Sequence, residues 1–130
     1  MFQIFDINVA TKYGIEEAIL IDHFQHWIEF EQRHKRNFHD GRTWTCRTLD
    51  EIANDIHFLN KSKVSYTIER LCNGKGCKSK KDTLDFEPIL MKGDYNKSAF
   101  AHTVWYAFVD EKEWIRDWGL RPGHPLLSLK

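Results

Sequence analysis

Two short helical patterns follow one another between Thr48 and Leu71, and they constrain the fold more than any other segment. Thr48 and Glu51 have the spacing of a capping box, which predicts that the first helix begins there. Asn60 is a favourable N-cap for the second helix, and the glycine at position 74 is a typical stop. The apolar stripes are Leu49, Ile52, Ala53 and Ile56 in the first helix and Val64, Ile68 and Leu71 in the second. Two such helices joined by a tight turn predict a helix-turn-helix.

The rest of the chain predicts a long helix, a few short strands and a final short helix. Apolar residues recur at helical spacing over residues 15–33, whereas the first ten residues show no clear period. We expect short strands at 44–47, 87–92 and 102–109, a turn at 93–97, an irregular loop at 75–86 and a helix at 111–119. This order predicts an α+β fold over residues 1–119. It is a winged helix-turn-helix with a three-helix core, a small antiparallel sheet and a short C-terminal helix, followed by a flexible tail at 120–130.

Charge is unevenly distributed, although the formal net charge of the 130 residues is zero. A basic segment at 61–81 contains a single acidic residue, Glu69, and the cations Lys61, Lys63, Arg70, Lys75, Lys78, Lys80 and Lys81. A basic segment on an otherwise acidic chain is typical of a protein that binds a polyanion, although a solvated lysine-rich loop has the same composition. No apolar stretch approaches the ~20 residues that cross a bilayer. The odd number of cysteines and the absence of a signal-peptide pattern favour a cytoplasmic protein without a membrane partner.

The second helix of the pair carries the candidate DNA contacts. We expect its outer face to present Ser62, Lys63, Tyr66, Glu69 and Arg70 to solvent, with Lys63 and Arg70 two turns apart. Arg70 could fork onto guanine O6 and N7, and Asn60 lies where a helix N-terminus could meet a phosphate. Further basic contacts are expected from Lys78, Lys80 and Lys81 after the helix and from Lys92 and Lys97 beside the turn of the hairpin. Glu69 opposes this interpretation, because its carboxylate would repel phosphates.

A protein-interaction role is the alternative to DNA binding. The aromatic C-terminal helix, with Trp114, Ile115 and Trp118, would be its adhesive element and could form a homodimer interface. The same two tryptophans could instead cover the core of the monomer. Apart from DNA, we therefore consider a second copy of the chain as a partner.

Catalytic and metal-binding patterns are weak. His23 and His26 have the spacing of a ligand pair on one helix, but no further residue clearly completes a site. Cys72 and Cys77 would need two more ligands to bind zinc, and Cys46 is one candidate. No glycine-rich phosphate loop, nucleophile motif or persuasive carboxylate pair occurs. We predict a protein that is not an enzyme, with no cofactor, no metal and no small-molecule substrate.

Several motifs, taken in order, resemble the winged-helix domain of small replication proteins from phages and prophages. They are Tyr13-Gly14, Ala18-Ile19-Leu20, Trp27, Gly41-Arg42-Thr43-Trp44-Thr45, Lys92-Gly93-Asp94-Tyr95-Asn96-Lys97 and Thr103-Val104-Trp105-Tyr106-Ala107-Phe108. That family is similar, more distantly, to the N-terminal domain of DnaD-type primosomal proteins. The resemblance covers roughly residues 8–110. It implies a replication initiation, accessory or regulatory factor of a phage or mobile element, with other replication proteins as partners. The chain departs from the pattern in a long stretch from Asn73 to Glu87, and we do not expect the second domain that replication proteins of this kind often carry.

Overall fold

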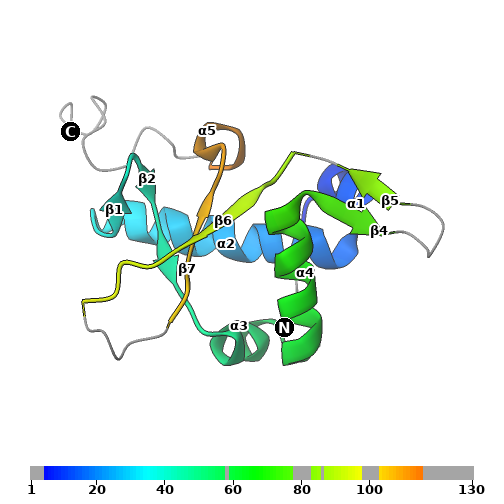
Figure 1. Cartoon of the computed structure of the whole chain (residues 1–130), viewed down its shortest axis with the longest axis horizontal. Coiled ribbons are helices and arrows are strands. Elements are labelled where there is room, and N and C mark those ends of the chain that lie inside the picture. The colour runs from blue at the N-terminus through cyan, green and yellow to red at the C-terminus, as the bar shows by residue number, and fades with distance from the viewer. Residues whose placement is uncertain (1–4, 58, 78–82, 86, 98–102, 116–130) are drawn as a thin grey trace.

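The computed structural model describes residues 5–57, 59–77, 83–85, 87–97 and 103–115, which form a mixed α+β fold, as the sequence predicts (Figure 1). The helices are α1 (Ile7–Tyr13), α2 (Ile15–Arg33), α3 (Leu49–Ile56), α4 (Lys61–Asn73) and α5 (Glu111–Trp114). The strands are β1 (Phe38–His39), β2 (Arg42–Thr43), β3 (Thr45–Cys46), β4 (Lys75–Cys77), β5 (Thr83–Asp85), β6 (Leu90–Gly93) and β7 (Trp105–Phe108).

Local capping signals set the ends of α3 and α4, as predicted. Thr48 accepts a hydrogen bond from the Glu51 amide at 3.1 Å, and Glu51 accepts one from the Thr48 amide, so the capping box is complete. Asn60 caps α4 by accepting the amide of Lys63 at 2.8 Å. Gly74 then ends α4 in the left-handed conformation that glycine adopts without steric cost.

A three-stranded antiparallel sheet packs against the helices in the order β3-β7-β6. Its registers pair Thr45 with Tyr106 and Leu90 with Phe108, so β7 occupies the centre of the sheet. The Ile89 amide donates to the Leu71 carbonyl at 3.0 Å, which ties the sheet to the end of α4. In Figure 1, β6 and β7 run across α2, and α4 stands beside them. We call β6, β7 and the chain between them the β6–β7 hairpin.

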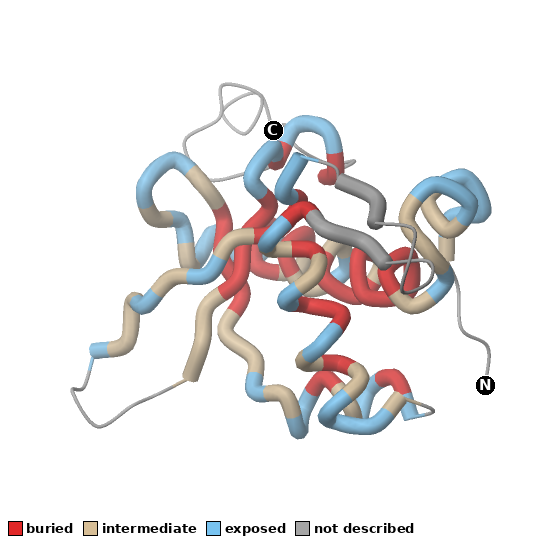
Figure 2. The backbone as a smooth tube through the Cα atoms, turned by 45° about the vertical axis from the view of Figure 1, so that its right-hand side comes forward, coloured by how far each residue is buried: buried red, intermediate tan, exposed pale blue. Residues whose placement is uncertain are grey.

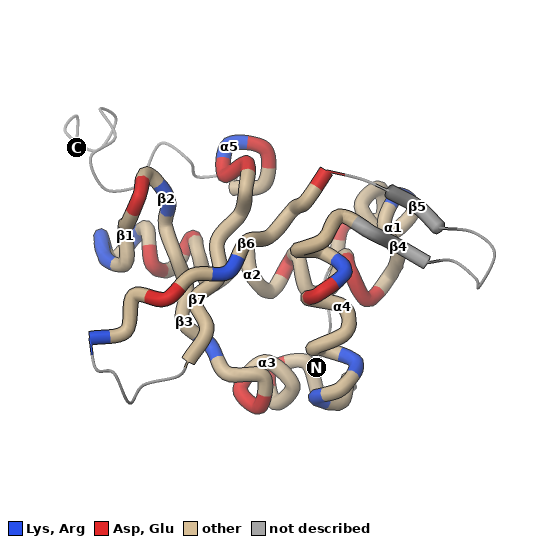
Figure 3. Tube along the Cα trace, in the orientation of Figure 1, with Lys and Arg blue, Asp and Glu red and all other residues tan. Residues whose placement is uncertain are grey.

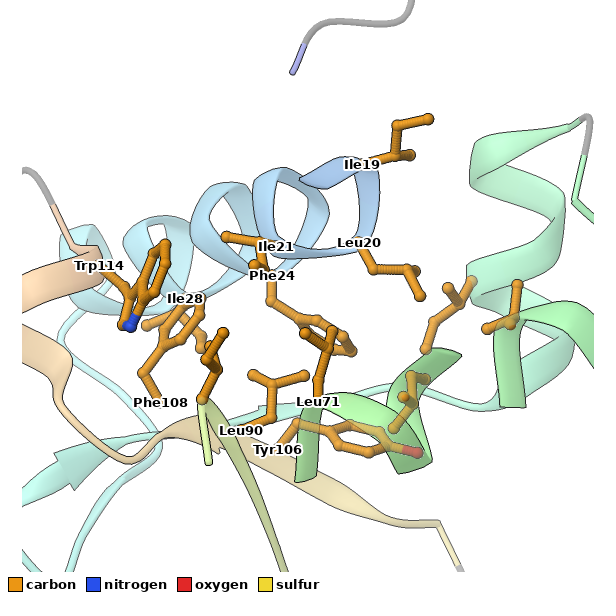
Figure 4. Close-up of a cluster of buried hydrophobic side chains, with 14 of the residues drawn as sticks. Ile19, Leu20, Ile21, Phe24, Ile28, Leu71, Leu90, Tyr106, Phe108 and Trp114 are labelled. Carbon is orange, nitrogen blue, oxygen red and sulfur yellow. The ribbon is translucent and has the colours of Figure 1, made fainter. Parts of the chain in front are cut away.

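The hydrophobic core lies between α2 and the other elements. Figure 2 shows buried residues along α2 and on the inward sides of α4 and the strands. In Figure 4, Phe24, Leu71, Leu90 and Tyr106 converge in this space, and the Phe24 and Tyr106 rings are 5.1 Å apart. Ile52 of α3 and Val64 and Ile68 of α4 are also fully buried. The predicted apolar stripes of α3 and α4 therefore face one common core, which fixes the outward side of α4.

Four segments differ from the sequence-based expectation. The first ten residues include the start of α1, whose N-cap is Asp6. The predicted loop at 75–86 contains β4 and β5, which pair antiparallel. The expected strand at 44–47 is shorter than predicted, since β3 covers only Thr45–Cys46, and another short strand, β2, lies just before it and pairs with β1. The final helix ends at Trp114, and the predicted tail at 120–130 lies outside the described residues. Among the described helices, none combines the length and the apolar character that a membrane span requires.

Candidate nucleic-acid interface

The outermost line of α4 is formed by four residues at helical spacing, Ser62, Tyr66, Glu69 and Asn73, which we call the α4 stripe. All four are exposed, and Tyr66 keeps 50% of its surface in solvent. At about 100° per residue, the four positions lie within about 60° of one another around the helix axis. The groups that α4 presents most directly to a partner are therefore hydroxyl, carboxylate and amide groups.

Arg70 lies on the flank of α4, which corrects the prediction that it stands in solvent. Its side chain is 17% exposed, and Nη1 lies 2.7 Å from Oε1 of Glu17, whose side chain is 1% exposed. Residue 70 is rotated about 100° from residue 69 around the helix axis, and this rotation turns Arg70 toward α2. Arg70 therefore compensates a buried carboxylate of its own chain and is not positioned to fork onto a guanine.

The contact between Glu17 and Arg70 is electrostatic more than directional. Burial raises the pKa of the Glu17 carboxyl, whereas a hydrogen bond from its own backbone amide and the charge of Arg70 act in the opposite direction. Although Arg70 Nη1 and Glu17 Oε1 are close, they do not have hydrogen-bond geometry. Within the described residues, neither Glu17 Oε1 nor Arg70 Nε has a hydrogen-bond partner. Because the pair is largely removed from water, deleting either charge leaves the other uncompensated.

Lys63 lies on the same flank as Arg70, but it is more open. Its Nζ is 3.6 Å from Oε1 of Glu16, and the two side chains are 42% and 39% exposed. The Tyr66 ring lies between the two cations, 5.8 Å from Lys63 Nζ and 5.5 Å from the Arg70 guanidinium carbon. Both are cation–π contacts, in which the face of an aromatic ring attracts a positive charge placed over it. Since an exposed ion pair contributes little, Lys63 can exchange Glu16 for a phosphate.

The N-terminus of α4 carries a cation, Lys61, that we did not predict as a DNA contact from the sequence. Lys61 is exposed, and its Nζ lies 3.5 Å from a carboxylate oxygen of Asp50 at the start of α3. The Asn60 side chain is engaged in capping, so its predicted phosphate contact would have to come from the helix terminus and not from this amide. Lys61 is therefore the better-placed phosphate ligand at this end.

The β6–β7 hairpin adds two lysines beside the α4 stripe. Lys92 on β6 forms an ion pair with Glu69, and Lys97 is exposed beyond the end of β6. A groove of about 270 Å³ separates α3, α4 and the hairpin, and Lys61 and Lys92 are among its lining residues. Figure 3 shows basic and acidic residues next to one another along α4, so its cations do not form an uninterrupted basic strip.

Two of the three predicted interface residues of the C-terminal helix, Trp114 and Ile115, belong to the core. Trp114 is 8% exposed and Ile115 is 3% exposed, and the Trp114 ring stacks on Phe108 at 6.1 Å. This burial corrects the expectation that they form an exposed adhesive element, because they are covered by their own chain. Four other predicted site residues lie outside the described residues: Lys78, Lys80, Lys81 and Trp118.

The weaker predicted constellations stay incomplete in the part of the chain that the structure describes. There, no group of three or more His, Cys, Asp or Glu side chains is arranged to hold a metal ion. His23 is buried and His26 is exposed, so the two residues are in different environments on α2. Cys46 and Cys72 are free thiols, and burial raises the pKa of Cys72 to about 11, which keeps that thiol protonated.

Comparison of the chain with protein-family models, with curated proteins and with solved structures found no match.

Proposed function

We propose that this chain is a winged-helix protein that binds duplex DNA through α4 and the β6–β7 hairpin. In this assignment α2, α3 and α4 are the three core helices, α4 enters the major groove and the hairpin is the wing. The order α2, β3, α3, α4, β6, β7 and the sheet order β3-β7-β6 support the assignment. A role in replication or in gene regulation of a phage or mobile element rests on the resemblance of the sequence motifs.

The observation that carries the proposal is the exposed side of α4 with a lysine-bearing hairpin next to it. The α4 stripe faces away from the core. Among the described residues, four lysines surround it: Lys61, Lys63, Lys92 and Lys97. Three of these lysines pair with acidic side chains that are 39–73% exposed. Surface pairs of this kind are worth about 0–1 kcal/mol, so phosphates can displace the carboxylates.

The salt dependence of binding tests the proposal. If four lysines neutralise four phosphates, the slope of log K against log salt is about −3.6, since each contact contributes about −0.9. Affinity for a fluorescent duplex, measured by anisotropy, should then fall roughly 150-fold between 50 and 200 mM salt. Replacing Lys61 and Lys97 by alanine should bring the slope to about −1.8. Replacing Lys112, which is exposed on α5 and belongs to neither α4 nor the hairpin, should leave the slope unchanged. Absence of binding at 50 mM salt would refute the proposal.

A protein-interaction role is the second candidate, and a hollow on another face favours it. The hollow encloses about 740 Å³ between α1, α2 and α5, and its lining includes Val9, Ile21 and Trp114. Ile7 of α1 is 75% exposed, and Ile15 of α2 is 57% exposed. Exposed apolar side chains on helices that also line a hollow are typical of a docking surface for a second copy or another protein. Self-association that is lost in an Ile7→Ser, Ile15→Ser variant would support this role.

A further inference from the structure

We infer that Glu69 is a specificity-determining residue that reads a cytosine in the major groove, while Lys92 neutralises its carboxylate. This inference rests on the proposed function, and it specifies one base that the bound DNA should contain. Glu69 lies in the α4 stripe, and its side chain is 50% exposed. It projects from the side of the helix that would face base edges, one turn after Tyr66.

The negative charge of Glu69 is compensated by a neighbouring lysine of the same chain. A carboxylate near phosphates is repelled, which argues against DNA binding when the sequence is considered alone. In the fold, Lys92 reaches from β6 to the Glu69 carboxylate. The pair therefore approaches DNA with no net charge. Because both side chains are 40% exposed or more, the pair can also open, so that Lys92 contacts a phosphate while Glu69 contacts a base.

The chemistry of a carboxylate selects cytosine among the four bases. In the major groove, cytosine presents its N4 amino donor and no acceptor. Guanine presents two acceptors, thymine one acceptor and a methyl group, and adenine an acceptor beside its amino group. A carboxylate only accepts hydrogen bonds, so it attracts the cytosine edge and repels the guanine edge. Arg70, the cation that would favour guanine, is engaged with Glu17.

Selection from a pool of random duplexes provides the test. Wild-type protein and the variants Glu69→Gln and Glu69→Ala are each used to enrich a duplex library at low salt, and the enriched pools are sequenced. Wild type should show one position at which cytosine is preferred by about 10-fold or more. Glu69→Gln should change that preference to adenine, because glutamine bonds bidentately to adenine N6 and N7. Glu69→Ala should lose the preference at that position alone.

Glu16→Gln is the matched control. It removes a carboxylate of α2 that is 39% exposed and pairs with Lys63 on the other flank of α4. This change should leave the cytosine preference unchanged. Identical motifs from wild type and both Glu69 variants would overturn the inference while leaving DNA binding intact. A motif change caused equally by Glu16→Gln would also overturn it, since the effect would then be one of net charge. Failure of wild type to retain any duplex would refute the proposed function and the inference together.

Discussion

Protonation of His23 should destabilise the fold in mildly acidic solution. His23 lies on α2, is 8% exposed and packs edge-on against Phe24 at 5.4 Å. Within the described residues its Nε2 is buried without a hydrogen-bond partner. Burial lowers the pKa of His23 from 6.5 to about 4; the Asp55 charge acts in the opposite direction, and Arg47 and His26 lower the pKa further.

The sign and size of the effect follow from linkage. Because the folded-state pKa is below the unfolded one, the unfolded chain binds more protons between pH 6.5 and 4. The contribution of neutral His23 is therefore complete above pH 6.5 and declines as the pH falls toward 4. The whole difference corresponds to about 3 kcal/mol, of which about 2 kcal/mol is lost between pH 7.5 and 5.

Urea unfolding at pH 7.5, 6 and 5 measures this loss. Wild type should lose about 2 kcal/mol of unfolding free energy over this range from His23. His23→Leu, which cannot be protonated, should lose correspondingly less. His26→Gln on the exposed side of α2 should keep most of the wild-type loss, because the His26 charge is the smallest of the named influences on the pKa of His23. The reasoning is refuted if His23→Leu and wild type lose the same free energy between pH 7.5 and 5.

Three further substitutions test the contacts that hold α3 and α4 in place. Arg70→Met should lower the free energy of unfolding by about 3 kcal/mol because it leaves Glu17 charged and buried, and Glu17→Gln combined with Arg70→Met should recover most of the loss. Denaturant unfolding of the single and double variants checks this, and additive losses would contradict it. Thr48→Ala should cost about 1 kcal/mol through loss of the capping box at α3, without changing affinity for DNA. An equal stability of Thr48→Ala and wild type would show that the cap is not needed.

Local signals in the sequence predicted the helices around the candidate site well. The capping residues Thr48 and Asn60 act within one turn of the chain, so their role is visible before any tertiary contact is known. The bounds of α2 follow in the same way from its apolar period between residues 15 and 33. In contrast, α1 has only seven residues, too few for a helical period to be clear. The strands β4 and β5 have three residues each, so their pairing depends on tertiary structure.

The errors at the site arise from contacts between elements. A helical wheel places Arg70 on the outer half of α4, but it does not indicate on which flank α2 crosses. Glu16 and Glu17 are expected at the start of α2 because of the helix dipole, and nothing local predicts that they also reach α4. Trp114 is similarly of a residue type that is common in interfaces, and only the fold shows that its own chain covers it. The pairing of Lys92 with Glu69 joins residues 23 positions apart and has no sequence signal.

The central claim is that the side of α4 beside the β6–β7 hairpin is the surface that binds DNA. Titration of isotope-labelled protein with a short duplex at low salt, followed by amide NMR shifts, tests it most directly. We expect shifts concentrated at residues 61–73 and 92–97, with α1 and α5 unaffected. Shifts confined to α1 and α5, or no shifts at a molar excess of duplex, would contradict it.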